Sequence, residues 1–289
     1  MSDLPSSRSD QSSPISGPVQ PAPVPLALAA PLSGPLGAPV LVLGNSLGTS
    51  AAVWEGQVGE LGKSFRLLRY EFPGHGGSAA AAGPYTIAGL GAGVLALLDS
   101  LGIRRAGYCG ISLGGMVGMW LASHAPDRIA ALGLVCTSAY LPPADGWYTR
   151  AARVRTAGLT AISAAVISRW FTPAYAAAAP SVIEQFRVGL EDTDPEGYAC
   201  CCEAIAGMDQ RADLAAITAP ALVIAGADDP ATPPEHGAAI AARIGGARLE
   251  VIPDAAHLAA VSAPDAVTDA LSAHLSAAAA GDAIWRDGR

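Results

Sequence analysis

Residues 108–116 read Tyr-Cys-Gly-Ile-Ser-Leu-Gly-Gly-Met, and the rest of the chain is interpreted from this stretch. Ser112 lies between Gly110 and Gly114, with an apolar run before it and a helix-like segment after it. A Gly-x-Ser-x-Gly sequence is typical of a serine nucleophile on a sharp strand-to-helix turn, where the glycines let strand and helix approach closely. Because Gly and Ser are common in this chain, the motif is informative only if a base, an acid and an oxyanion site accompany it.

Strand-like and helix-like segments alternate on both sides of this motif. We expect strands where short apolar runs are bounded by turn residues, and helices where apolar residues recur every three or four positions. The expected strands are 24–30, 39–43, 65–70, 105–110, 129–137, 221–225 and 248–252. The expected helices outside the middle of the chain are 54–61, 86–101, 113–124, 234–244 and a last one ending near 278. This pattern predicts an α/β fold with a mostly parallel central sheet and helices on both faces.

The alternation stops in the middle of the chain. Residues 138–217 contain helical segments near 146–155, 159–170, 181–190 and 195–208 but no convincing strand, so we interpret them as an inserted helical cap. The cap divides the core into residues 24–137 and 218–278. Residues 1–23 are rich in Ser and Pro and are expected to form a disordered tail, and residues 279–289 are expected to form a flexible C-terminal tail.

A serine nucleophile needs a histidine base and a carboxylate that orients it, in the chain order Ser, acid, His for this type of fold. His257 directly follows the last expected strand, whereas the other four histidines precede the serine or fall within helices: His75, His124, His236 and His274. The loop after strand 221–225 offers two carboxylates, Asp228 and Asp229. We choose Asp229 because it immediately precedes Pro230 and should lie deeper in the loop, whereas Asp228 suits a turn cap or a solvent-facing position.

The oxyanion site needs two backbone N–H groups that point at the same oxygen atom. One is expected from Leu113, the residue after the nucleophile. The other is expected from Leu47, in the loop Gly44–Thr49 that follows the buried strand 39–43. Loops at the carboxyl edge of an open α/β sheet are where ligands bind, so this position favours a functional role over an ordinary turn.

The composition excludes several classes of function. With 17 Lys and Arg against 25 Asp and Glu, the net charge of −8 argues against a nucleic acid partner, which would need clustered basic residues. Five cysteines, three of them consecutive at 200–202, form neither a disulfide framework nor a Cys-x-x-Cys metal site. Because the start does not read as a signal peptide and no apolar run reaches about 18 residues, we expect a soluble, cytoplasmic protein with no membrane partner.

Short motifs in several parts of the chain occur together in one known family. Beside the Gly-x-Ser-x-Gly-Gly turn, they are Gly44-Asn45-Ser46-Leu47-Gly48-Thr49, Leu68-Arg69-Tyr70, Gly74-His75-Gly76, Gly83-Pro84-Tyr85-Thr86-Ile87, Arg169-Trp170-Phe171-Thr172 and Glu196-Gly197-Tyr198. With them the chain resembles the α/β-hydrolase superfamily and, more closely, the 3-oxoadipate enol-lactonases of aromatic-compound breakdown. The resemblance implies Ser112, Asp229 and His257 as a catalytic triad. It also implies hydrolysis of 3-oxoadipate enol-lactone to 3-oxoadipate with no metal or organic cofactor.

The substrate implied by this resemblance is a small lactone with a free carboxylate, so a cation is expected in the cap. Trp147 and Arg150 lie three residues apart and can share one helix face, which would offer an aromatic wall and a carboxylate partner. Three other cap residues compete for the carboxylate: Arg153, Arg155 and Arg169. Further expected substrate contacts, from the family motifs, are Asn45, Ser46 and Trp170.

Two other functions fit the same residues. One is an esterase or lactonase that uses the same triad on a different substrate, since the cap determines specificity. The other, from a different class, is a non-catalytic ligand receptor with a hydrolase fold. The presence of a Ser, an Asp and a His in the expected order disfavours it. The sequence gives no prediction of the oligomeric state.

Overall fold

The computed structural model describes residues 22–286, so residues 1–21 of the expected N-terminal tail lie outside the described part. Its centre is a seven-stranded sheet in the order β1-β3-β2-β4-β5-β6-β7. The strands are β1 (Ala27–Leu28), β2 (Val40–Gly44), β3 (Arg66–Glu71), β4 (Ala106–Ile111), β5 (Ile129–Val135), β6 (Ala221–Gly226) and β7 (Arg248–Ile252). Each expected strand is therefore present, although the first is only two residues long.

The sheet is parallel except for β1, which pairs antiparallel with β3. The strands β2, β4, β5 and β6 are buried along their whole length, as expected for strands covered on both faces. Because parallel strands end at the same edge of a sheet, the loops after β2, β4, β6 and β7 meet there. These four loops carry the residues for which the sequence predicts a catalytic function.

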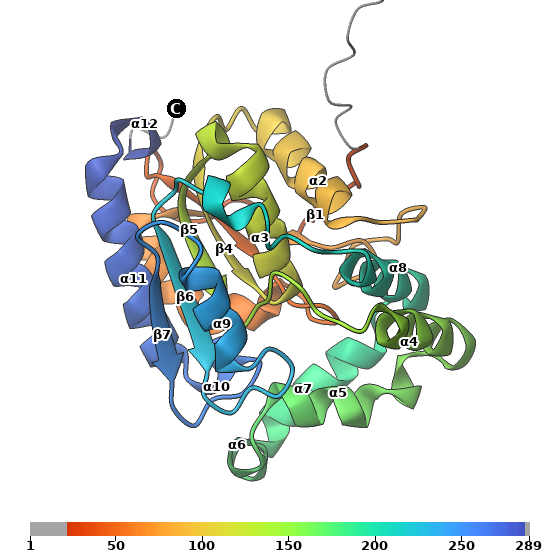
Figure 1. The fold of residues 1–289 in the computed structure, drawn as a ribbon. Helices are drawn as coiled ribbons and strands as arrows, with labels where there is room; N and C mark the ends of the chain where they lie inside the picture. Colours follow the sequence, from red (N-terminus) through yellow and green to blue (C-terminus); the bar gives the residue numbers. More distant parts are fainter. Residues whose placement is uncertain (1–21, 287–289) are drawn as a thin grey trace, which may run out of the picture.

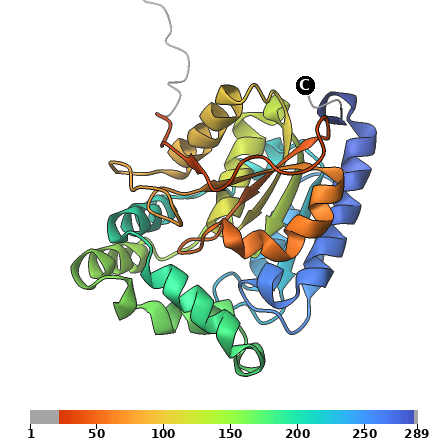
Figure 2. The same ribbon diagram turned by 180° about the vertical axis from the view of Figure 1, so that it is seen from behind.

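Helices cover both faces of the sheet, which confirms the predicted fold class. In Figure 1, α2 (Ile87–Ser100), α3 (Leu113–His124) and α9 (Pro234–Ala241) lie over one face. Figure 2 shows α1 (Glu55–Ser64) and α11 (Pro264–Gly281) over the other, with the short α10 (Ala259–Ser262) leading into α11. Of the helices between residues 22 and 286, none is long and apolar enough to cross a membrane.

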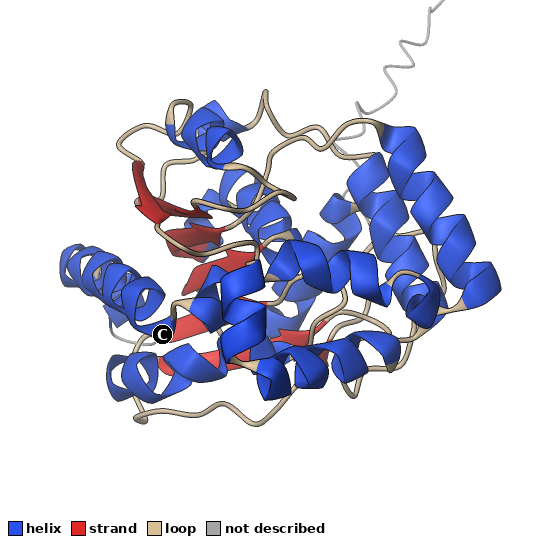
Figure 3. Ribbon diagram, turned by 90° about the horizontal axis from the view of Figure 1, so that it is seen from below, coloured by secondary structure: helices blue, strands red, loops and turns tan. Residues whose placement is uncertain are grey.

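The segment between β5 and β6 is helical, and Figure 3 shows that the strands gather in one half of the molecule while the other half has only helices and loops. Its helices are α4 (Ala144–Ala157), α5 (Ser163–Trp170), α6 (Pro173–Ala178), α7 (Pro180–Glu191) and α8 (Pro195–Ala206). The short α6, which the periodicity did not predict, starts where Thr172 accepts a hydrogen bond from the N–H of Tyr175. A β-bridge between Tyr140 and Asp209 joins the two connections of this helical segment to the core.

The C-terminal region differs from the expected flexible tail. Helix α11 continues to Gly281, and α12 (Ala283–Arg286) follows it. The side chain of Trp285 is fully buried, stacks on Phe65 with ring centroids 5.6 Å apart, and donates a 2.8 Å hydrogen bond from Nε1 to the carbonyl oxygen of Val40. The prediction for residues 279–286 was wrong because these contacts reach back more than 200 positions in the chain, and local composition carries no sign of them.

Replacing Trp285 with Ala should lower the free energy of unfolding by about 3–5 kcal/mol, because it removes a fully buried aromatic side chain. Urea unfolding followed by circular dichroism would measure the change. Its neighbour Ile284 is 54% exposed, so Ile284→Ala is the matched control and should change stability by less than about 0.5 kcal/mol. Equal, small effects of both substitutions would contradict the packing of α12 against the core.

Candidate active site

Ser112 occupies the sharp turn between β4 and α3. Its backbone has φ 52° and ψ −111°, a left-handed conformation that is strained for a residue other than glycine. Two glycines make the turn possible, because an added Cβ at Gly110 would lie 2.2 Å from the carbonyl carbon of Gly114, and one at Gly114 would lie 2.4 Å from the carbonyl oxygen of Gly44. The Gly-x-Ser-x-Gly motif is thus required by the close approach of three backbone segments.

The side chain of His257 is hydrogen-bonded to Asp229, with 2.8 Å between Nδ1 and Oδ2, and both residues are buried. Asp229 accepts three further hydrogen bonds, from the backbone N–H groups of Ala231 and Thr232 and from the hydroxyl of Thr232. Its neighbour Asp228 is exposed and lines a different surface depression. The structure therefore pairs the histidine with Asp229, the carboxylate that we chose from the sequence.

The environment keeps Asp229 ionised at neutral pH. Burial alone would raise the pKa of its carboxyl group, but the neighbouring His257 and the donors from Thr232 outweigh burial and lower the pKa to about 2. An ionised carboxylate can only accept hydrogen bonds, so the proton of the histidine ring lies on Nδ1. The opposite ring nitrogen, Nε2, is then free to accept a proton.

The cap holds the backbone of the histidine loop. The N–H of His257 donates to the carbonyl oxygen of Arg169 at 3.4 Å, and the N–H of Leu258 donates to that of Trp170 at 3.0 Å. Arg169 and Trp170 form the last turn of α5, where helix carbonyls lack partners within the helix. The last turn of α5 therefore anchors the main chain of the histidine loop.

Neither of the two N–H groups expected to form the oxyanion site donates a hydrogen bond within its own helix or turn. Leu113 is the first residue of α3, where helical N–H groups have no acceptor within the helix. Leu47 is the second residue of a turn closed by a 3.1 Å hydrogen bond from the N–H of Thr49 to the carbonyl oxygen of Ser46. The assignment of both groups to an oxyanion site stays a prediction.

Asn45 lies behind this turn and does not contact the cavity. It is fully buried, its side-chain amide donates to the carbonyl oxygen of Thr49, and its own carbonyl oxygen accepts a 3.0 Å hydrogen bond from the N–H of Gly114. The structure therefore does not place Asn45 in the cavity lining, where the sequence predicts a substrate contact, and its side chain instead shapes the loop from inside. Ser46, in contrast, lines the cavity.

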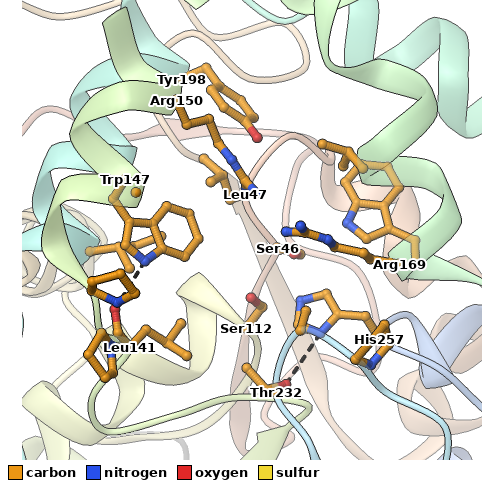
Figure 4. A pocket seen from close by; sticks show the side chains of 18 residues that line it. Ser46, Leu47, Ser112, Leu141, Trp147, Arg150, Arg169, Tyr198, Thr232 and His257 are labelled. Atoms are coloured by element: carbon orange, nitrogen blue, oxygen red, sulfur yellow. Dashed lines mark hydrogen bonds between the residues drawn. The ribbon is translucent and has the colours of Figure 1, made fainter. Parts of the chain in front are cut away.

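A cavity of about 610 Å³ opens between the sheet edge and the cap. Ser112 and His257 both line it, as do the three cap residues predicted to contact the substrate, Trp147, Arg150 and Trp170. In Figure 4 the Ser112 hydroxyl and the His257 ring lie next to each other on its floor, below the cap side chains. The remaining lining residues are mostly apolar: Leu47, Leu141, Pro142, Pro143, Gly146, Val166, Tyr198, Ile205, Pro230 and Ala231, with Ser46, Arg169 and Thr232.

Of the four cap arginines considered from the sequence, two reach the cavity. Arg150 lies over the ring of Trp147, 4.8 Å from its centroid, and Arg169 extends over the cavity floor in Figure 4. Arg155 forms salt bridges with two glutamates of α8, and Arg153 donates to the carbonyl oxygen of Ala161. Neither Arg150 nor Arg169 forms a salt bridge within residues 22–286, and no Asp or Glu belongs to the cavity lining.

Two polar residues near the site were not found from the sequence. Thr232 has a recognisable sequence signal, because a Thr three residues after an Asp is well placed to donate a hydrogen bond to its carboxylate in a turn.

Glu71 has no such sequence signal, because the residue that it contacts is distant in the chain. This buried carboxylate accepts the N–H of Ala51 with both oxygens, at 3.0 and 3.1 Å, and burial raises its pKa to about 7. Glu71 thereby holds the segment that follows the loop of Leu47.

The described part of the chain contains no group of three or more His, Cys, Asp or Glu side chains placed to hold a metal ion. The five cysteines are all buried and unpaired, and none lines the cavity. The polar groups available to a ligand in this cavity are therefore hydroxyls, guanidinium groups, backbone N–H groups and one imidazole. Such a set is suited to nucleophilic attack on a carbonyl group and to the binding of an anion.

Comparison with known proteins agrees with this arrangement. Residues 39–264 match a family model described as the alpha/beta hydrolase fold. The 3-oxoadipate enol-lactonase 2 of Acinetobacter baylyi is 41% identical over 235 residues, which cover 81% of this chain and 88% of that protein. The crystal structure of the enol-lactonase from Burkholderia xenovorans LB400 has a TM-score of 0.84 and 42% identity, covering 87% of this chain and 96% of that one.

A more distant relative carries a different name. A putative carbamate hydrolase of a Caulobacter species is 30% identical over 256 residues, covering 83% of this chain and 91% of that protein. One relative is named an enol-lactonase and the other a putative carbamate hydrolase, so the two names differ in the group given as the substrate. The shared fold therefore supports hydrolysis, while the choice of substrate depends on the residues that line the cavity.

Asp229→Asn should lower kcat for a 4-nitrophenyl ester by about 10³- to 10⁴-fold at neutral pH, because the amide no longer selects the Nδ1-protonated form of His257. The adjacent Asp228→Asn is the matched control. Its side chain is exposed and away from the histidine, so its kcat should stay within about twofold of wild type. A comparable loss in both variants would overturn the choice of Asp229.

Glu71 should make stability depend on pH. Burial raises the pKa of Glu71 in the folded protein to about 7, from its ordinary value of 4.5. At a pH between these two values, Glu71 is protonated in the folded state and ionised in the unfolded state. The free energy of unfolding should therefore fall as pH rises through this window, by about 1–3 kcal/mol. Denaturant unfolding of wild type and Glu71→Gln from about pH 5 to about pH 8 would measure it. Parallel pH profiles of the two proteins would contradict the prediction.

Proposed function

Because this chain belongs to the α/β-hydrolase superfamily, and within it to the family of the 3-oxoadipate enol-lactonases, we propose that it hydrolyses 3-oxoadipate enol-lactone to 3-oxoadipate. The observation that carries the proposal is the cavity itself. It combines Ser112, the hydrogen-bonded pair of His257 and Asp229, and two arginines without a carboxylate partner among the described residues. A neutral ester would need the serine and histidine but not the arginines.

In the proposed reaction, Nε2 of His257 takes the proton of the Ser112 hydroxyl while Oγ attacks the lactone carbonyl carbon. The backbone N–H groups of Leu47 and Leu113 stabilise the negative charge on the carbonyl oxygen. Collapse of this intermediate breaks the bond to the ring oxygen and leaves an acyl group on Ser112. The leaving group is an enolate, which is a weaker base than a simple alkoxide and becomes a ketone after protonation, so modest acid assistance from the imidazolium suffices.

Water then releases the acyl group. His257 takes one proton from a water molecule as its oxygen attacks the acyl carbon, the bond to Ser112 Oγ breaks, and the serine regains its proton from the histidine. The ionised Asp229 stabilises the imidazolium in both steps. Apart from the lactone and water, the proposed chemistry uses side chains and backbone groups of this chain.

The cap supports the choice of a carboxylate-bearing lactone. The proposed partner of the substrate carboxylate is Arg150, which is half-buried and held between the Trp147 ring and Tyr198. Its guanidinium lies on the cap side of the cavity in Figure 4, across from the nucleophile. Trp147 and Trp170 both line the cavity and offer flat apolar surfaces for the lactone ring.

The test follows the loss of enol-lactone absorbance with wild type, Ser112→Ala and Arg150→Ala. Ser112→Ala should lower kcat by at least about 10⁴-fold, because the acyl-enzyme can no longer form. Arg150→Ala should raise KM for the lactone by about 10- to 100-fold, the effect of losing one charge-assisted hydrogen bond. Arg153→Ala, which removes a cap arginine that does not line the cavity, is the matched control and should leave KM unchanged.

Each contrary result points to a specific alternative. Equal lactone turnover by wild type and Ser112→Ala would exclude the acyl-enzyme mechanism. No lactone turnover, together with labelling of Ser112 by a fluorophosphonate, would indicate a hydrolase of a different ester, lactone or carbamate. Failure of accessible Ser112 to label at all would favour a ligand receptor with a hydrolase fold.

A further inference from the structure

The second arginine of the cavity has no part in the reaction described above. Arg169 lines the same cavity as Ser112 and His257, and its guanidinium has no carboxylate partner within residues 22–286. In the view of Figure 4 it extends between Arg150 and the His257 ring, above Ser112. Arg169 therefore lies between the proposed subsite of the substrate carboxylate and the residues proposed to break the bond.

The main chain of Arg169 is bonded to the histidine loop. The carbonyl oxygen of Arg169 accepts the N–H of His257, and that of the next residue, Trp170, accepts the N–H of Leu258. The side chain of Arg169 thus starts from a residue that is directly bonded to the histidine loop. The lining contains Arg150 and Arg169 but no Asp or Glu, and the ionised Asp229 behind His257 is already engaged by its own hydrogen bonds. Two guanidinium groups in one cavity, neither paired with a carboxylate of the described residues, favour anions with more than one negative group.

The charge of the ligand changes during the proposed reaction. The enol-lactone carries one carboxylate, and its hydrolysis adds one water molecule, breaks the bond between the acyl carbon and the ring oxygen, and yields a second carboxyl group. At neutral pH this new group loses its proton to solvent, so a monoanion becomes a dianion. The second carboxylate forms at the carbon that was bonded to Ser112 Oγ.

We propose that Arg169 binds the carboxylate that hydrolysis creates beside Ser112, so that the cavity has two anion subsites and binds linear dicarboxylates better than monocarboxylates. The identity of the second carboxylate as a product group rests on the proposed function, whereas the two-subsite cavity rests on the geometry alone. Arg150 then holds the carboxylate present before the reaction, and Arg169 holds the new one. One consequence is competitive inhibition by the product and by dicarboxylates of similar length.

Binding is measured by the change in tryptophan fluorescence during titration with adipate or hexanoate, since two of the five tryptophans, Trp147 and Trp170, line the cavity. These probes have six carbons and differ in one carboxylate. Wild type should bind adipate about tenfold more tightly, since one charge-assisted hydrogen bond at a partly solvated site has roughly this effect. Arg169→Gln should abolish this preference, and Arg169→Lys should retain part of it.

Hexanoate serves as the control for folding, because its single carboxylate needs only one of the two arginines. Its affinity should change by less than about threefold in Arg169→Gln. The matched control Arg153→Gln removes the same charge from the cap outside the cavity and should keep the adipate preference. Equal binding of adipate and hexanoate by wild type would overturn the proposal, and this test needs no variant. An unchanged preference for adipate in Arg169→Gln would also overturn it.

Lactone kinetics distinguish the two carboxylates. Arg169→Gln should raise the inhibition constant of adipate about tenfold but raise KM for the lactone by less than about threefold, whereas Arg150→Gln should raise both. An equal rise of KM in the two variants would show that Arg169 holds the substrate carboxylate and would overturn the assignment. If the lactone is not a substrate, the proposed function fails, and the fluorescence titration still decides whether two anion subsites exist.

Discussion

The close approach of backbone segments at the end of β4 is the constraint on which the rest of the site depends. Gly110 and Gly114 leave no room for a Cβ atom, and the N–H of Gly114 donates to the carbonyl oxygen of Asn45 in the loop after β2. The turn that strains Ser112 therefore also fixes the loop that contains Leu47. Ser112, the proposed nucleophile, and the proposed oxyanion donors are positioned by one set of main-chain contacts, which leaves the side chains free for chemistry.

Much of this arrangement could be predicted from the sequence, because it follows from local patterns. Buried parallel strands appear as short apolar runs, and the residues just after them must meet at one edge of the sheet. This reasoning located Ser112 and His257 and narrowed the acid to two adjacent aspartates. The position of Asp229 before Pro230 then indicated the one that the structure places against the histidine.

The features that could not be predicted depend on contacts between distant parts of the chain. Trp285 stands among small and polar residues, and only the fold brings it to Phe65 and Val40. Asn45 looked like a ligand contact because it belongs to a family motif, but its side chain points into the protein and bonds Thr49. Arg169 was one of four similar cap arginines, and which of them reach the cavity depends on how the cap helices pack.

The hydrogen bonds from His257 and Leu258 to the end of α5 have a consequence for how such proteins diversify. The cap is a continuous insertion in the sequence, so recombination could exchange it as a unit between relatives. The cap is nevertheless joined to the core by hydrogen bonds, because the last turn of α5 supplies the carbonyl oxygens that accept the N–H groups of the histidine loop. A transplanted cap would bring new pocket walls and also a new support for His257, the proposed general base, so a change of specificity would also change the setting of the proposed catalytic histidine.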